Sequence, residues 1–137
     1  MAKTLIDPKD IRTKGGFAFV LSDGFALHTS DREGPGPLLT LYDASIHCED
    51  FAVSAHKVGI AEAFLLLALR VKEVESDEIG ADALELLKDN GIKIKCETII
   101  PEPVDPLIPG GALAPKVYPG QALLVIQNAY HPKKPKK

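Results

Sequence analysis

The sequence is poor in the residues on which several functions depend. Among its 137 residues there is no Trp, only 6% are aromatic and only two are Cys. So few rings leave little for stacking single-stranded nucleic acid, and the core must be mainly aliphatic. Two cysteines are too few for a disulfide-rich scaffold. We therefore expect free thiols and a cytoplasmic protein.

Long apolar runs are missing as well. The longest, Ala63–Leu69, is far shorter than the roughly 20 residues that a membrane-spanning helix requires. The N-terminal segment MAKTLIDPKDIRTK is polar and lacks the apolar centre of a signal peptide. We expect no membrane partner.

The charge distribution disfavours nucleic acid as a partner. The net charge is −3, and the last seven residues, HPKKPKK, contain four lysines. Without those four charges the first 130 residues carry a net charge of −7. An acidic body repels the phosphate backbone, so we expect no specific nucleic-acid partner. The basic tail is typical of a solvated chain end.

Only half of a zinc motif is present. His47-Cys48-Glu49 matches the His-x-Glu half of the zinc-deaminase signature, in which His binds zinc and Glu transfers protons. The Pro-Cys-x-x-Cys half is absent, since Cys96 is the only later cysteine. No set of four ligands at zinc-like spacing is visible elsewhere. We therefore predict no metal and no cofactor.

The pattern of apolar residues predicts an α/β fold. Strands are expected at 17–21, 25–29, 51–55, 71–75 and 92–100, and helices at 38–44, 58–70 and 81–89. A helix between two strands forces a parallel crossover, whereas Asp23-Gly24 indicates a hairpin. Residues 1–100 are thus predicted to form a three-layer α/β/α domain with a mixed sheet of about five strands.

The remainder, residues 101–137, is predicted to be a Pro-rich C-terminal extension. It holds eight of the eleven prolines and ends in the basic tail. Within it, Gln121–Gln127 has the composition of a strand and is too apolar to remain in solvent. This strand either adds to the edge of its own sheet or packs on a neighbouring subunit. We expect the subunit contact, which makes the protein a homo-oligomer.

The best candidate for a ligand site follows the buried strand 51–55. His56 and Lys57 are predicted to lie in a tight turn that opens the next helix. Ligands of α/β sheets bind at the carboxyl ends of strands, and free amides at a helix start attract anions. Lys57 would oppose the helix dipole unless an anion were nearby. We predict that Ser54, His56, Lys57 and Gly59 contact a small anionic or nucleotide-like ligand. The alternative is that Lys57 reaches water and His56 only caps the turn.

Two other stretches are less informative. Residues 73–89 contain seven carboxylates, which the helix and strand spacing places mainly on a solvated face. Gly34-Pro35-Gly36-Pro37 precedes a helix, as a phosphate-binding loop does, but it has no Gly-Lys-Ser/Thr and its prolines remove backbone donors. We interpret it as a rigid turn.

Several segments resemble a family of small bacterial and archaeal proteins, a domain of unknown function with a cytidine-deaminase-like fold. They are Gly36–Leu39, Phe51–Val58, Val71–Val74, Ala83–Leu87 and Gly91–Ile94. The resemblance implies an α/β/α core without zinc motifs and with no established activity. The family's turn usually reads Asp-Lys-Val-Val-Gly-Lys. Here Lys57 and Val58 match it, whereas His56 replaces the Asp, Gly59 comes one place early and Ala61 replaces the second Lys.

Three classes of function therefore remain open. The leading hypothesis is a deaminase-fold protein without zinc that binds a small ligand, or regulates a partner, through the stretch around Lys57. The second is a structural or oligomerisation module that uses residues 101–137. The third is an enzyme with an unrecognised site, in which His56 would act as a base.

Overall fold

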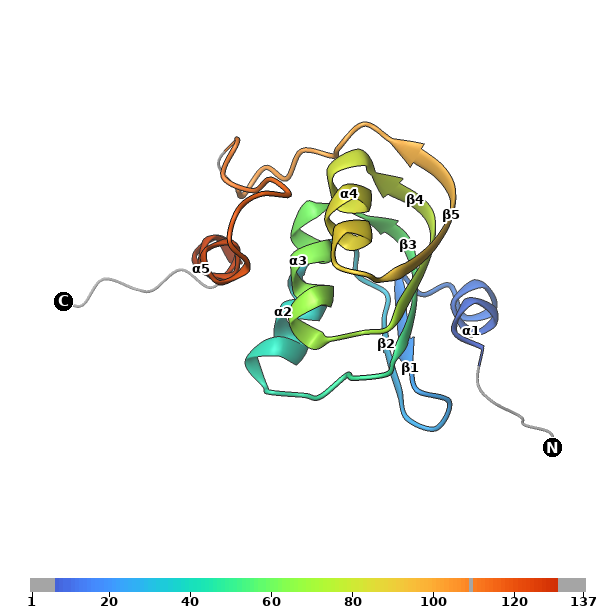
Figure 1. Cartoon of the computed structure of the whole chain (residues 1–137). Coiled ribbons are helices and arrows are strands. Elements are labelled where there is room, and N and C mark those ends of the chain that lie inside the picture. The colour runs from blue at the N-terminus through green and yellow to red at the C-terminus, as the bar shows by residue number, and fades with distance from the viewer. Residues whose placement is uncertain (1–6, 109, 131–137) are drawn as a thin grey trace.

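A computed structural model describes residues 7–108 and 110–130 and contains one mixed five-stranded sheet with helices on both faces (Figure 1). The strands are β1 (Phe19–Ser22), β2 (Leu27–Ser30), β3 (Ala52–Val58), β4 (Glu73–Gly80) and β5 (Lys93–Ile100). The helices are α1 (Pro8–Gly15), α2 (Gly36–Asp43), α3 (Ile60–Leu69), α4 (Ala81–Asp89) and α5 (Pro119–Tyr130).

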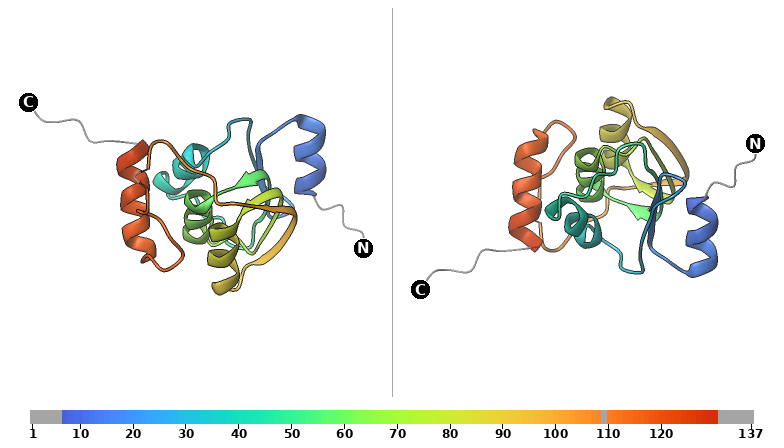
Figure 2. Two further views of the ribbon diagram at one scale, coloured as in Figure 1. Left: turned by 90° about the horizontal axis from the view of Figure 1, so that it is seen from above. Right: turned by 90° about the horizontal axis from the view of Figure 1, so that it is seen from below.

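The strand order is β2-β1-β3-β4-β5. β1 is antiparallel to both of its neighbours, and β3, β4 and β5 are parallel to one another. α1 covers one face of the sheet, α2, α3 and α4 cover the other, and α5 lies outside α3 (Figures 1 and 2). The predicted α/β class and the mixed five-stranded sheet with helices on both faces are confirmed.

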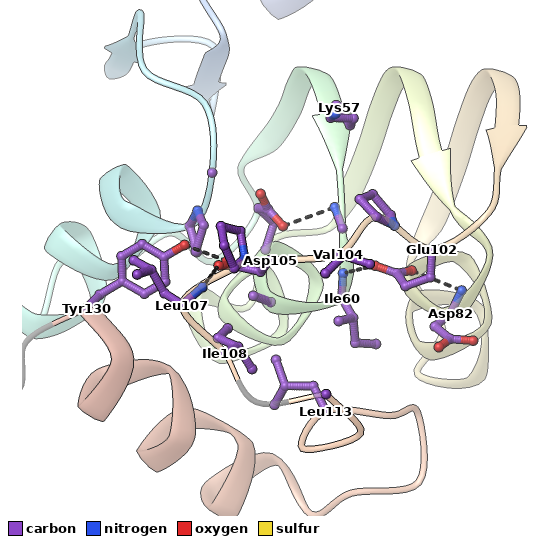
Figure 3. Close-up of a pocket in the computed structure, with 18 of the residues that line it drawn as sticks. Lys57, Ile60, Asp82, Glu102, Val104, Asp105, Leu107, Ile108, Leu113 and Tyr130 are labelled. Carbon is purple, nitrogen blue, oxygen red and sulfur yellow. Dashed lines mark hydrogen bonds between the residues drawn. The ribbon is translucent and has the colours of Figure 1, made fainter.

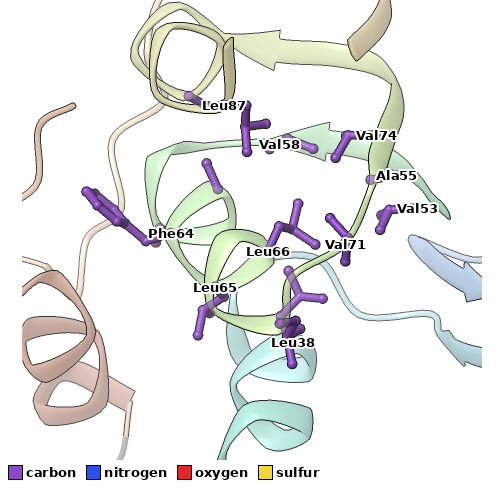
Figure 4. Close-up of a cluster of buried hydrophobic side chains, with 14 of the residues drawn as sticks. Leu38, Val53, Ala55, Val58, Phe64, Leu65, Leu66, Val71, Val74 and Leu87 are labelled. Atoms are coloured by element: carbon purple, nitrogen blue, oxygen red, sulfur yellow. The ribbon is translucent and has the colours of Figure 1, made fainter. Parts of the chain in front are cut away.

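α3 is the centre of the core. Its buried side chains, among them Phe64, Leu65 and Leu66, face the sheet and the surrounding helices (Figure 4). On the sheet side they meet Val53 and Val74, both almost fully buried. The helix is apolar nearly all round because it is covered by the sheet and by α2, α4 and α5.

Two predicted strands are too short. β3 runs on to Val58, so His56 and Lys57 lie in a strand and not in a turn. The cause is pairing with β4, which continues through Lys57–Glu78 and Val58–Ile79 and keeps the backbone extended. β4 likewise continues through half of the acidic stretch to Gly80, because it is paired on both sides.

The predicted strand at 121–127 is wrong, because the segment belongs to α5. Ala122 and Ile126 are four residues apart and both fully buried, which is the spacing of one helix face. They pack with α3 in the same apolar cluster as the rest of the core, whereas Leu124 points outward at 60% exposure. The basic tail, 131–137, lies outside the described residues. In the described part of the chain, no helix has the length and apolarity to cross a bilayer.

Candidate functional site

A cavity of about 650 Å³ lies at the carboxyl ends of β3 and β4, where α3 and α4 begin (Figure 3). Its other walls are the loop before α2, the last residue of α5, part of the segment 110–114, and most of residues 101–108, here called the strap. The strap follows β5 and crosses in front of both helix starts. The cavity therefore lies at the edge of the sheet that the parallel topology favours for ligands.

The four residues predicted to bind a ligand are divided between three places. Lys57 and Gly59 line the cavity. Ser54 is buried under α1, where it accepts a hydrogen bond from Arg12 Nε (2.7 Å) and donates one to Glu75 Oε1 (2.5 Å). His56 does not line the cavity; it is half exposed and pairs through Nδ1, at 2.9 Å, with Oε2 of Glu33, which does line it.

The starts of α3 and α4 share one capping group, the carboxylate of Glu102. Its Oε2 accepts from Ile60 N (2.7 Å), the first amide of α3. Its Oε1 accepts from Asp82 N and Ala83 N, both at 3.1 Å, near the start of α4. The amides that open a helix have no partner within the helix, and a negative charge there also complements the helix dipole. One strap side chain therefore joins two helices (Figure 3).

Glycine at both N-caps makes this arrangement possible. Gly59 and Gly80 precede α3 and α4 and have no side chain with which to cap them. A Cβ on Gly80 would lie 2.3 Å from Glu102 Oε1 and 2.7 Å from Pro103 Cδ. A Cβ on Gly59 would lie 2.9 Å from Glu62 Oε1 and 3.3 Å from Glu102 Oε2. Both glycines are thus required for close approach and not for a left-handed backbone.

Glu62 is the second carboxylate at the helix start. Its Oε1 accepts from Gly59 N at 3.0 Å, which is the reciprocal half of a capping box. Burial, followed by the charges of Asp105 and Glu102, raises the pKa of Glu62 to about 7. Burial also raises the pKa of Glu102, although the amides that it accepts from oppose the shift. A carboxyl group that titrates near neutral pH can donate or accept a proton under ordinary conditions.

A third carboxylate, Asp105, attaches the strap to α5. Tyr130 OH donates to Asp105 Oδ2 at 2.5 Å, and Leu107 N donates to Asp105 Oδ1 at 2.9 Å (Figure 3). Burial and this hydrogen bond raise the pKa of Tyr130, so the phenol stays neutral. The strap is therefore held at one end by α3 and α4 and at the other by α5.

The cavity is acidic. Lys57 is the only basic residue in its described lining, which includes the carboxylates of Glu33, Glu62, Asp82, Glu102 and Asp105. The backbone donors that would attract an external anion are already bound to Glu102 and Glu62. With the strap in place, the cavity favours a ligand that brings positive charge or N–H donors.

The other candidate residues lie apart from the cavity. Cys48 is fully buried, which raises the pKa of its thiol, and His47 beside it is exposed. Cys96 is a free, partly buried thiol on β5, and His28 stacks on Phe51 with ring centroids 5.8 Å apart. Within residues 7–108 and 110–130, no group of three or more His, Cys, Asp or Glu side chains is arranged to hold a metal ion.

Residues 9–104 match the model of a family described as a domain of unknown function, DUF1893, or TM1506. The chain belongs to the DUF1893 family. This confirms the sequence-based assignment to a family without a known function. The matched region contains α3, α4 and Glu102 but ends before α5.

A solved structure supports the fold of this DUF1893 member. It is the crystal structure of the DUF1893 family protein TM1506 from Thermotoga maritima, with a TM-score of 0.73. The two sequences are 18% identical, and the alignment covers 93% of this chain and 95% of that one. At this identity the likeness shows the fold alone. Comparison with curated proteins found no significant match.

Sequence reasoning did not find Glu62, Glu102, Asp105 and Tyr130. One signal was available: Gly59 followed three residues later by Glu62 has the spacing of a capping box. Glu102 is 42 residues from Ile60 in the sequence, and no local sequence pattern predicts a hydrogen bond between them. The unsatisfied amides after two N-cap glycines only imply that some distant acceptor must exist.

Proposed function

We propose that this protein binds a small molecule in the cavity where α3 and α4 begin, and that the bound part of the ligand is cationic or rich in N–H donors. The observation that carries the proposal is the lining: five carboxylates and a single lysine around about 650 Å³. That volume is within the usual range for small-molecule sites. The proposed ligand therefore has the opposite charge to the anionic ligand expected from the sequence. An uncharged nucleoside still has a suitable size and shape.

The same proposal includes a cytidine-deaminase-like core without zinc. Its support is the mixed sheet with β1 antiparallel to its neighbours and the packing of the helices that follow β2 and β3. The positions that would carry metal ligands at the start of the central helix are Gly59, Ile60 and Ala61, none of which coordinates zinc through a side chain. In this proposal the cavity binds its ligand without zinc.

A thermal-shift series tests the ligand chemistry with matched pairs. Adenosine is compared with its 5′-monophosphate, and a diamine with the dicarboxylate of equal length. We expect the nucleoside and the diamine to raise the Tm by several degrees at saturating concentration, because only the folded state binds them. Glu62→Gln should reduce the shift, whereas Glu85→Gln, on the exposed side of α4, should not.

Two results would change this conclusion. If only the phosphate and the dicarboxylate raise the Tm, and Lys57→Ala removes the effect, the anionic ligand predicted from the sequence is correct. If no member of the series shifts the Tm of the wild-type protein, the small-molecule proposal fails.

A second candidate function is assembly through the C-terminal region. Four large apolar side chains there remain exposed: Val104 (90%), Tyr118 (79%), Leu124 (60%) and Leu107 (56%). Burying them against another subunit would remove that apolar surface from water. Light scattering after size exclusion should then give an oligomer that Leu124→Glu converts to monomer. A monomeric wild-type protein at micromolar concentration would exclude this function.

A further inference from the structure

The strap is fastened by a small number of polar contacts. Glu102 and Asp105 make its hydrogen bonds to α3, α4 and α5. In the described chain, its one backbone–backbone hydrogen bond is internal, from Ile108 N to Asp105 O. Pro101, Pro103 and Pro106 have no N–H to donate. The strap therefore covers the helix starts without joining the sheet or the helices as a regular element.

Apolar packing adds little to this attachment. Val104 is 90% exposed and Leu107 is 56% exposed, so neither side chain is anchored in the core. Ile108 is partly buried against the apolar core. By contrast, the residues of α3 that face the sheet are fully covered. Segments with few buried apolar contacts open at a lower free energy than the core does.

The electrostatic surroundings of Glu102 also weaken the closed position. Its carboxylate has no cationic partner among the hydrogen bonds and ion pairs of the described residues. The ionisable groups that share its cavity are mostly acidic: Glu33 before α2, Lys57 on β3, Glu62 on α3, Asp82 on α4, Asp105 in the strap and Tyr130 on α5. Carboxylates that line one cavity disfavour one another's charged forms.

We propose that the strap, residues 101–108, is a lid that opens when Glu102 leaves the starts of α3 and α4, and that this opening admits the ligand to the cavity. Opening takes Glu102 and Asp105 away from Glu62, which relieves the crowding of three carboxylates. Water can then reach the three amides that Glu102 covers, while the apolar core stays packed. The gating role rests on the proposed function, whereas the opening itself can be measured without any ligand.

Amide hydrogen exchange measured by NMR tests the opening directly. The amides of Ile60, Asp82 and Ala83 share one acceptor residue, so they should exchange with the same opening constant in the wild-type protein. We expect this exchange to be at least tenfold faster than that of Phe64, in the buried middle of α3. Equal and slow exchange of all four amides would show that the strap unfolds only with the whole protein, and the lid would be wrong.

Gly80→Ala moves the strap without changing its charge. The added Cβ meets Glu102 and Pro103, and the φ of −68° at this position suits alanine, so the strain falls on the strap. Exchange at the three amides should rise a further tenfold or more. The matched control is Gly36→Ala, because a Cβ there meets no atom within 4 Å. It should leave their exchange unchanged.

Glu102→Gln supplies an independent variant. The neutral amide keeps the size of the side chain but replaces one accepting oxygen with a donor that faces backbone N–H groups. The three amides should again exchange faster, with Phe64 unchanged. If either variant accelerates all amides together, or none, the strap is part of the cooperative core. If the three amides exchange fast but no compound in the thermal-shift series raises the Tm, the lid proposal stands and only the proposed function fails.

Discussion

Two clusters of partly buried carboxylates, one under α1 and one in the cavity at the carboxyl edge of the sheet, are stabilised in different ways. Under α1, Asp77 and Glu75 surround Arg12, which is only 4% exposed. At the cavity, the hydrogen-bond donors to Glu62 and Glu102 from residues 7–108 and 110–130 are all backbone amides. A buried charge needs an opposite charge or several hydrogen bonds to stay ionised.

The difference indicates which cluster is structural. Arg12 binds Asp77 through both nitrogens of its fork, at 2.9 and 3.2 Å, and reaches Ser54 through Nε. Each of its three side-chain nitrogens donates to a fixed partner, which fastens α1 to β3 and β4. At the cavity, Glu62 and Glu102 have raised pKa values and face open volume. Perturbed groups of this kind concentrate at functional sites.

Removing Arg12 should have the largest effect on stability. Arg12→Met keeps the bulk of the side chain but leaves Asp77 without its cation, Glu75 with only the more exposed Lys9, and Ser54 without a donor. Breaking a buried ion pair from one side costs about 3–5 kcal/mol, and the partial exposure of Asp77 brings our estimate to about 3 kcal/mol. Urea unfolding followed by circular dichroism measures this change.

The control for Arg12 is Lys9→Ala. Lys9 also pairs with Glu75, at 3.6 Å, but its side chain is 46% exposed. An exposed pair contributes well under about 1 kcal/mol, so this variant should be close to wild type. If the two variants lose equal amounts of unfolding free energy, burial does not make the Arg12 ion pairs stronger than an exposed pair. The contrast between the α1 cluster and the cavity would then be wrong.

The cavity cluster should show itself in the pH dependence of stability. The pKa of Glu62 rises from 4.5 to about 7 on folding, so the folded state binds its proton more tightly than the unfolded state does. The free energy of unfolding should therefore fall as the pH rises from about 4.5 to 7, and level off above that. The limit for this one group is about 3 kcal/mol, at about 1.4 kcal/mol per pKa unit. The raised pKa of Glu102 acts in the same direction.

Urea unfolding at pH 5 and pH 8 measures this decline. Glu62→Gln should remove most of it, and the exposed Glu85→Gln should preserve it. Asp23, whose pKa is lowered by the amides of Ala26 and Phe25, affects stability only below this range. A decline of the same size in Glu62→Gln would assign the effect to other carboxylates and would contradict the contrast between the clusters.

Local patterns were sufficient for most of the fold but not for the site. Alternation and helical spacing located β5, α3 and α4, because those signals arise within about ten residues. Gln121–Gln127 was assigned to a strand because its five central residues are all apolar. The burial of Ala122 and Ile126 against α3 favours a helix instead. The turn around Lys57 was placed too early because β4 extends the neighbouring strand.

The candidate site depends on contacts between distant parts of the chain. The sequence directed attention to the carboxyl edge of β3, because that edge follows from strand order, and the cavity lies there. The charge of the cavity could not, because Glu102 and Asp105 come from the Pro-rich strap and Tyr130 from α5. Likewise, Glu75 and Asp77 were expected on a solvated face, and their pairing with Arg12 crosses more than sixty residues.

The smallest expected effect concerns the hydrogen bond between Tyr130 and Asp105. Tyr130→Phe removes the hydrogen bond that Asp105 accepts from outside the strap, the only such bond among the residues that the structure describes. A hydrogen bond to a charged group contributes about 1.5–3 kcal/mol, and partial exposure of both residues reduces our estimate to about 1 kcal/mol. Tyr42→Phe is the control, because its hydroxyl makes no hydrogen bond within the described residues and should change stability by less. If Tyr130→Phe is as stable as wild type while exchange at Ile60 is unaltered, the end of the strap near α5 does not contribute to holding the lid. Glu102 would then hold it alone.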